Sequence, residues 1–174
     1  MIRSKAPAAL VAACITFIAA SATARDAAYT AAFNARSLAL HNQHRAQHHA
    51  PPLSLDNALA RGAQSYAEKL AASGTLAHSR GNYGENLYMS VGHSFDAEAL
   101  ADAAVNGWYN ESRSYNYKRP GFSMQTGHFT QVVWKGTTKV GCGAAWRSTR
   151  YVVVCRYAPA GNELDAFDRN VLRP

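Results

Sequence analysis

The stretch GHFTQVVW, Gly127–Trp134, sets one histidine in a short apolar run that carries two aromatic rings. The two rings and the two valines are expected to pack in the core of the protein. His128 has two alternative roles, because it can satisfy one hydrogen bond inside that core or face a site and do chemistry there. This stretch alone does not distinguish the two roles, so the rest of the sequence is needed.

The first 24 residues have the composition of a secretory signal peptide. MIRSK is a short basic start, AALVAACITFIAA is an apolar run, and Ala22-Thr23-Ala24 is a cleavage site of the A-x-A kind. The apolar run is shorter than the roughly 20 residues that a membrane-spanning helix needs, so a membrane anchor is the weaker alternative. We predict a signal peptide over residues 1–24, a loose lead-in over 25–34 and one domain over 35–174.

Cleavage after Ala24 changes the cysteine count and the charge. It removes Cys14, and the remaining pair, Cys142 and Cys155, predicts one disulfide in an oxidising compartment. It also removes Arg3 and Lys5, so the formal net charge of +7 falls to +5. No Lys/Arg run indicates nucleic-acid binding. The sequence therefore predicts a basic secreted, extracellular protein that can contact membrane or cell-wall surfaces.

Local patterns predict three helices followed by a β-hairpin. The helices are expected over residues 33–48, from an N-cap at Asp56 to residue 73, and from Asp96 to about residue 113; the strands over 138–146 and 150–157. Residues 78–94 are expected to form a loop interrupted by the short strand NLYMS. This order favours an α+β fold, a layered α/β/α domain, over a doubly wound parallel sheet.

Several histidines and glutamates are candidates for a site. His41, His44 and His48 share one helical face that could hold a metal, although a solvated helix end is the favoured alternative. A second set is more widely spaced along the chain and comprises His78, Glu85, Glu111 and His128. Spacing alone does not assemble this tetrad, and each member also suits an ordinary surface, loop or core position.

Seven stretches occur in order from about Leu38 to the C-terminus: HNQHR, PPLSLDNALARGAQSYA, LAHS, YGENLY, WYNESRSYNY, PGFSMQTGHFTQVVWKGTTKVGCG and YVVVCRYAPAGN. Together they resemble the CAP superfamily of cysteine-rich secretory proteins, insect venom antigen 5 and plant pathogenesis-related class 1 proteins. The chain is most similar to its compact fungal secreted sterol-binding members and to the Golgi-associated plant pathogenesis-related protein. GHFTQVVW followed by VGCG is the most specific of these motifs.

The resemblance implies a three-layer α/β/α sandwich of the CAP type, with the tetrad at the floor of an open cleft. By motif, His78 matches the histidine of the H-S segment, Glu85 the acid of G-E-N, Glu111 the acid after the W-Y pair and His128 the histidine of G-H-F. Several family members bind a divalent ion, often zinc, through the two histidines, so His78 and His128 are the expected metal ligands. Cys142 and Cys155 match a family disulfide.

An aromatic loop follows the third helix, with Tyr115, Tyr117 and Phe122 in an aromatic-x-aromatic-x4-aromatic pattern. In the sterol-binding relatives a similar loop is implicated in sterol capture, and aromatic rings offer stiff apolar area that suits a flat ring system. These three residues are therefore the expected lipid-binding set. The alternative is that the rings simply pack on the sandwich.

Three functions remain open at this point. We expect a secreted protein that binds sterols or other small lipids and has a His/Glu cleft able to hold zinc or another divalent cation. A metal-dependent peptidase is the alternative from another class, although no third ligand and no H-E-x-x-H pattern are evident, and no catalytic residue is assigned. A non-enzymatic protein-interaction module in defence or virulence is the third. The sequence predicts no oligomeric state.

Overall fold

The computed structural model describes the backbone of residues 9–174 and the side chains of residues 27–174. The elements are α1 (Ala9–Gln47), β1 (Ser54–Leu55), α2 (Asn57–Ser73), β2 (Gly84–Val91), α3 (Ala97–Asn110), the 3-10 helix η1 (Glu111–Ser114), α4 (Gly127–Val133), β3 (Lys139–Arg147), β4 (Arg150–Ala158) and α5 (Phe167–Asn170). Residues 1–8 of the predicted signal peptide lie outside the described residues. Within the described part of the chain, no helix is long and apolar enough to span a bilayer.

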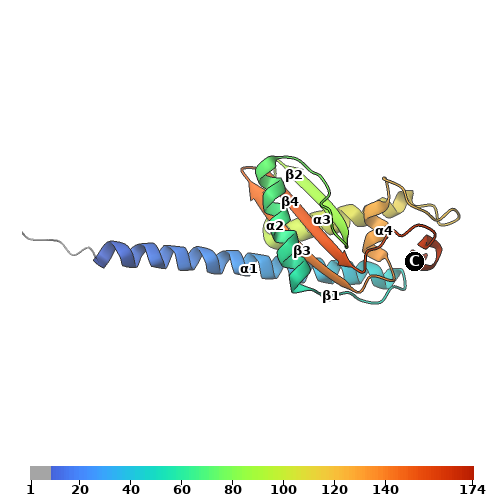
Figure 1. Ribbon diagram of the computed structural model, residues 1–174, viewed down its shortest axis with the longest axis horizontal. Helices are drawn as coiled ribbons and strands as arrows, with labels where there is room; N and C mark the ends of the chain where they lie inside the picture. Colours follow the sequence, from blue (N-terminus) through green and yellow to red (C-terminus); the bar gives the residue numbers. More distant parts are fainter. Residues whose placement is uncertain (1–8) are drawn as a thin grey trace, which may run out of the picture.

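The four strands form one mixed sheet in the order β1-β3-β4-β2. β3 pairs antiparallel with β4, and β4 antiparallel with β2, whereas the short β1 lies parallel to β3. Figure 1 shows α2 crossing one face of the sheet, with α1 and α3 behind the other face. The predicted α+β sandwich is therefore confirmed, and β1 is an addition too short to leave a periodic signal in the sequence.

β4 supplies side chains to both layers of the core. Val152 and Val154 pack with α2 on one face, whereas Val153 and Cys155 pack with α1, α3 and α4 on the other. Successive side chains of a strand point to opposite faces, so a strand covered on both sides needs an uninterrupted apolar run. This requirement explains the run YVVVC.

The glycines of VGCG bring α2 directly onto β3. A Cβ added at Gly141 would overlap the backbone of Ala60, and one at Gly143 would overlap the backbone of Gln64. Between them, Cys142 faces the opposite layer and forms the predicted disulfide with Cys155, its direct partner across the hairpin, with Cα atoms 4.1 Å apart. One four-residue motif therefore fixes both a helix–sheet contact and a cross-link.

The predicted ends of two helices are confirmed. The Asp56 side chain accepts hydrogen bonds from the first N–H groups of α2, and Gly74 ends that helix in the left-handed conformation, with φ 74°. Asp96 caps α3 by accepting from the N–H of Ala99. β2 is longer than the predicted NLYMS, because it also pairs with β4 at Gly84 and Glu85.

The N-terminal helix differs most from expectation. The loose lead-in predicted for residues 25–34 is instead helical, as part of α1. Alanine has the highest helix propensity, and Phe33 is buried in the core with Tyr29 packed against it. The packed body of the protein therefore begins before residue 35.

His41 and His44 of α1 and His48, which directly follows it, are buried, so the predicted solvated helix end is wrong. His41 bonds the Ser37 carbonyl and the Tyr157 hydroxyl through its two ring nitrogens, and His48 bonds the Leu172 carbonyl through Nδ1. The His44 ring stacks on another ring, that of Tyr109, with centroids 3.7 Å apart. The alternative of a metal site gains no support, since the described residues contain no metal-compatible group of three or more His, Cys, Asp or Glu.

We predict that these histidines make the fold sensitive to mild acid. Burial lowers the pKa of His41 from 6.5 to about 4, and burial also lowers the pKa values of His44 and His48. Below pH 6.5 these histidines are protonated in the unfolded chain but stay neutral in the folded protein. The free energy of unfolding should therefore fall as the pH drops from about 6.5 toward 4. Urea denaturation at pH 7, 6 and 5 measures this fall.

Two variants distinguish the contribution of the buried histidines to this pH dependence from that of other groups. His48→Gln should flatten the pH dependence, whereas a change at an exposed histidine, His93→Asn, should leave it intact. Equal stability of the wild type at pH 7 and pH 5 would contradict the prediction.

Candidate functional site

The helix α4 divides the GHFTQVVW stretch between core and site. Phe129, Val132, Val133 and Trp134 are buried, as predicted. The imidazole of His128 remains about one-third exposed and bonds the Glu111 carboxylate, with Nδ1 and Oε1 2.7 Å apart. His128 is therefore not enclosed in the core, and its ring is held by the Glu111 carboxylate.

Glu111 fixes both the backbone and the ring of His128. Its Oε2 accepts hydrogen bonds from the N–H groups of His128 and Phe129, at 3.0 and 3.1 Å, while Oε1 bonds the ring. Thr126 occupies the N-cap position but makes no side-chain cap. The carboxylate of Glu111 therefore satisfies the free N–H groups at the start of α4, where a negative charge is favourable.

Trp108 and Asn86 connect His128 to strand β2. The indole of Trp108 stacks near the His128 ring, with centroids 6.2 Å apart, and its Nε1 donates to the Leu87 carbonyl. Asn86 Nδ2 donates to the carbonyl of His128. The imidazole is thus held by the end of α3, by η1 and by the central sheet.

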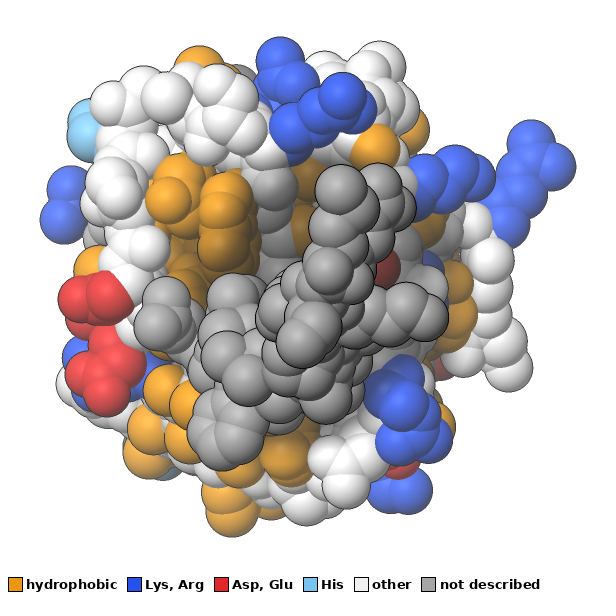
Figure 2. Space-filling view, turned by 90° about the vertical axis from the view of Figure 1, so that its left-hand side faces the viewer, with side chains coloured by type: hydrophobic (Ala, Val, Ile, Leu, Met, Phe, Trp, Pro, Cys, Tyr) orange, Lys and Arg blue, Asp and Glu red, His pale blue; other side chains and the backbone are white. Residues whose placement is uncertain are grey.

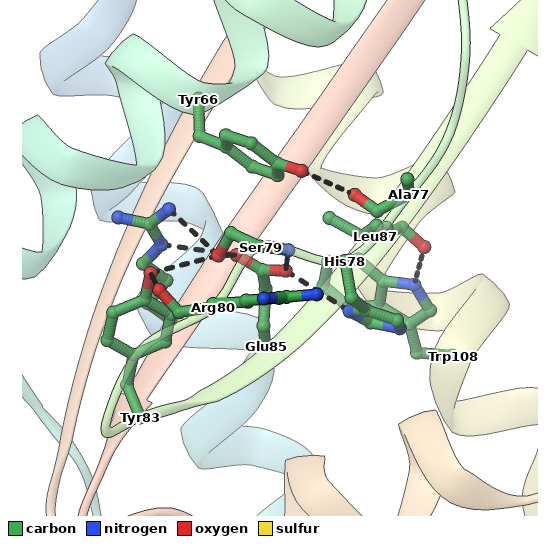
Figure 3. Close-up of polar contacts among 10 residues, drawn as sticks. Tyr66, Ala77, His78, Ser79, Arg80, Tyr83, Glu85, Leu87 and Trp108 are labelled. Atoms are coloured by element: carbon green, nitrogen blue, oxygen red, sulfur yellow. Dashed lines mark hydrogen bonds and ion pairs between the residues drawn. The ribbon is translucent and has the colours of Figure 1, made fainter.

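Glu85 is the centre of a second network, drawn in Figure 3. Its carboxylate accepts from the N–H of Ser79 at 2.8 Å, from His78 Nδ1 at 3.1 Å and from Arg156 Nε at 3.2 Å. Burial alone would raise the pKa of Glu85, but the hydrogen bonds from Ser79, His78 and Arg156 outweigh it and hold the pKa below its ordinary value. Glu85 is therefore an anion whose oxygens are already engaged.

Sequence reasoning missed three members of this network, Ser79, Tyr83 and Arg156. Arg156 lies 4.3 Å from the centroid of the Tyr83 ring and also donates to Ser79 Oγ. Arg156 stands directly opposite Glu85 in the pairing of β2 with β4. An opposite charge at that position is a cross-strand signal, but it can be used only once the register of the two strands is known.

The structure arranges the predicted tetrad as two histidine–glutamate pairs, His78 with Glu85 and His128 with Glu111. A carboxylate that accepts from Nδ1–H leaves the Nε2 lone pair free, which is the usual way that proteins orient a metal-binding histidine. Both imidazoles therefore have a carboxylate partner of the kind that orients metal-binding histidines. They do not supply the three protein ligands typical of catalytic zinc, since the described residues contain no such group.

The aromatic loop does not act as one surface. Tyr115 is buried, and its ring packs edge-on against Tyr117 and against Phe129 of the core. Tyr117 is half-buried beneath the guanidinium of Arg173. Phe122 is 51 % exposed. The packing alternative thus holds for Tyr115, because this ring fills the space beside α4, and only Phe122 presents much of its ring to solvent.

Comparison with known proteins agrees with this geometry. Residues 38–157 match the cysteine-rich secretory protein family, CAP. The chain is 44 % identical over 149 residues to the human Golgi-associated plant pathogenesis-related protein 1, covering 82 % of this chain and 94 % of that protein. It is also 44 % identical over 135 residues to Protein PRY2 of Saccharomyces cerevisiae, covering 76 % of this chain but only 39 % of the longer yeast protein.

A solved structure shows the same fold. The crystal structure of NaASP2 with Zn2+ superimposes with a TM-score of 0.66 at 25 % identity, over 80 % of this chain and 85 % of that one. The matched segment, residues 38–157, contains both histidine–glutamate pairs and the disulfide. The chain therefore belongs to the CAP family of cysteine-rich secretory proteins.

Proposed function

We propose that this protein is a secreted binding protein for sterols or related small lipids, which it captures beside Phe122. The observation that supports the proposal is that two exposed apolar side chains, Phe122 and Leu164, which are 51 and 78 % exposed, line one surface cavity. Apolar side chains gathered in this way on a surface commonly mark a binding site for a protein, a lipid or a membrane.

This cavity has a volume of about 400 Å3. It is lined by residues 120–122 and by four residues of the C-terminal segment, Leu164, Asp165, Phe167 and Asp168. This volume lies within the size range of small-molecule sites, which are typically lined by apolar and aromatic side chains. The cavity therefore combines the apolar side chains of Phe122, Leu164 and Phe167 with two carboxylates.

Gly127 places this cavity next to the histidine site. A Cβ at Gly127 would lie 3.0 Å from the Phe122 ring, so the glycine of GHF leaves room for that ring against the start of α4. Tyr115 supports the loop from below, as a core residue. In the proposal Phe122 is the contact residue, whereas Tyr115 and Tyr117, whose rings pack against each other, have a structural part.

Secretion is proposed on separate grounds. Residues 1–24 have the composition of a signal peptide. The disulfide between Cys142 and Cys155 is of the kind that persists in oxidising compartments. An extracellular or secretory-pathway location would expose the lipid site to membranes and cell-wall surfaces.

Sterol titration tests the lipid proposal. Phe122→Ala should weaken binding of a fluorescent cholesterol analogue by about tenfold, since burying a large apolar side chain is worth roughly 1.5–3 kcal/mol. Leu76→Ala, which truncates an exposed apolar residue elsewhere, should bind like the wild type. Saturable binding that survives Phe122→Ala and Leu164→Ala unchanged, or no binding by the wild type, would contradict it and favour an interaction surface for proteins.

A second proposal is that His78 and His128 hold a divalent cation, with zinc as the first candidate. Its support is the matched arrangement of the two imidazoles, each bonded through Nδ1 to a carboxylate. The structural neighbour NaASP2 was crystallised with Zn2+. The peptidase alternative has no comparable support, because a third protein ligand is not evident among the described residues.

Calorimetric titration with zinc chloride tests the metal proposal. His78→Ala and His128→Ala should each lower the affinity at least about tenfold, and Glu111→Gln should lower it less, because it disturbs the orientation of a ligand and not a ligand itself. His93→Ala, which removes an exposed histidine outside the tetrad, serves as the control. Equal zinc affinity in the wild type and both tetrad histidine variants would rule the proposed ligands out.

A further inference from the structure

A groove of about 1080 Å3 lies between α1 and α2, on the far side of β3 from β4. It shares no lining residue with the cavity beside Phe122. β1 pairs only with Lys139 and Val140, so in the described part of the chain no strand lies beside β3 from Cys142 onward. Figure 2 looks at the end from which α1 projects and shows apolar side chains around a hollow beside that helix.

Side-chain amides take the place of a strand along this free edge. Asn34 Oδ1 accepts from the N–H of Cys142 at 3.1 Å. Gln64 makes two bonds to Ala144, accepting from its N–H at 3.0 Å and donating to its carbonyl at 2.9 Å. A neighbouring strand exchanges the same pair of bonds with each residue that faces it, so the edge already recognises amide groups.

A stripe of mostly small apolar side chains runs along the α1 wall of the groove, which Tyr29, Thr30 and Asn34 also line. Ala27, Ala31, Ala35 and Leu38 form this stripe, and their spacing places them on one face of the helix. Ala31 and Ala35 are exposed, so no other described side chain covers them. This wall suits side chains such as valine or alanine.

The α2 wall is polar. Asn57, Arg61, Ser65 and Glu68 line it, again at the spacing of one helical face. α1 and α2 cover opposite faces of the sheet, and successive side chains of a strand point to opposite faces. A strand placed beside β3 would therefore direct alternate side chains to an apolar wall and to a polar wall.

We propose that this groove binds an extended peptide segment, which adds as a strand to β3 between Cys142 and Trp146. Its apolar side chains face α1, its polar side chains face α2, and its backbone replaces the carboxamide of Gln64 at Ala144. When the peptide displaces the Gln64 carboxamide from Ala144, its Nε2 can keep the hydrogen bond that it already donates to Glu68 Oε1 at 2.9 Å. Strand addition to a free sheet edge is a general mode of peptide recognition.

The flanking helices select the occupant. In a second copy of this chain the same edge of β3 lies between α1 and α2. Pairing the two edges would bring the helices of one copy against those of the other. A single extended chain carries no such layers and needs only the width of one strand. The inference is independent of the lipid proposal, since the two sites share no residue.

The probe for this site is an acetylated hexapeptide of alternating valine and serine, titrated into the labelled protein and followed by amide NMR. The amide signals of Cys142, Ala144 and Trp146 should shift saturably. Ala35→Arg puts a long charged side chain into the groove and should weaken binding at least about tenfold, whereas Ala39→Arg, exposed on α1 outside the groove, should bind like the wild type. The same peptide with proline at its third position should not bind, because proline lacks the N–H.

Gln64→Ala gives the sharpest result. Removal of the competing carboxamide should increase peptide affinity by about threefold to tenfold, the range that one backbone hydrogen bond commonly supplies. A purely structural role of Gln64 predicts weaker or unchanged binding, and that result would overturn the proposal. No saturable shift with the hexapeptide, equal binding by Ala35→Arg, or shifts with decanoate and none with peptide would overturn it as well.

Discussion

The buried guanidinium of Arg45 connects the first helix of the protein to the segment that carries the site. Its Nε donates to the Pro51 carbonyl, Nη1 to the carbonyls of Val132 and Trp134, and Nη2 to that of Thr137, at 2.8–3.1 Å. Burial lowers the pKa of Arg45 to about 10, which still leaves it charged at neutral pH. Four carbonyl dipoles, two of them at the end of α4, therefore balance one buried charge.

This contact explains how a seven-residue helix can position a functional side chain. A helix as short as α4 is not stable alone, so its geometry must come from its surroundings. Arg45 holds the C-terminal end of α4, and Glu111 holds the N-terminal end through two backbone N–H groups. His128 is fixed between two charged side chains from different parts of the chain. His78 is held differently, by a carboxylate anchored to Arg156 across the sheet.

Local sequence signals predicted the parts of the fold that depend on local chemistry. The caps at Asp56 and Asp96, the helix end at Gly74 and the cross-strand disulfide follow from side chains near the elements they define. The features that these signals did not predict depend on tertiary packing. The polar pattern HNQHR resembles a solvated helix end, yet Arg45 and His41 are fully buried because distant carbonyl and hydroxyl groups satisfy them. The aromatic pattern likewise predicts that Tyr115 binds a ligand, whereas its ring packs against Phe129 of α4.

The pairing within the tetrad depended on tertiary structure in the same way: the motifs identified its four members by family resemblance, but only the strand register and the position of η1 show which histidine meets which acid. The most direct test of this account is amide hydrogen exchange in Arg45→Lys, with the surface variant Arg36→Lys as control. Lysine cannot reach all four carbonyls, so exchange at His128 and Phe129 should accelerate more than at Val153 in the sheet, and only in Arg45→Lys. Equal protection of α4 in both variants would contradict the central role of Arg45.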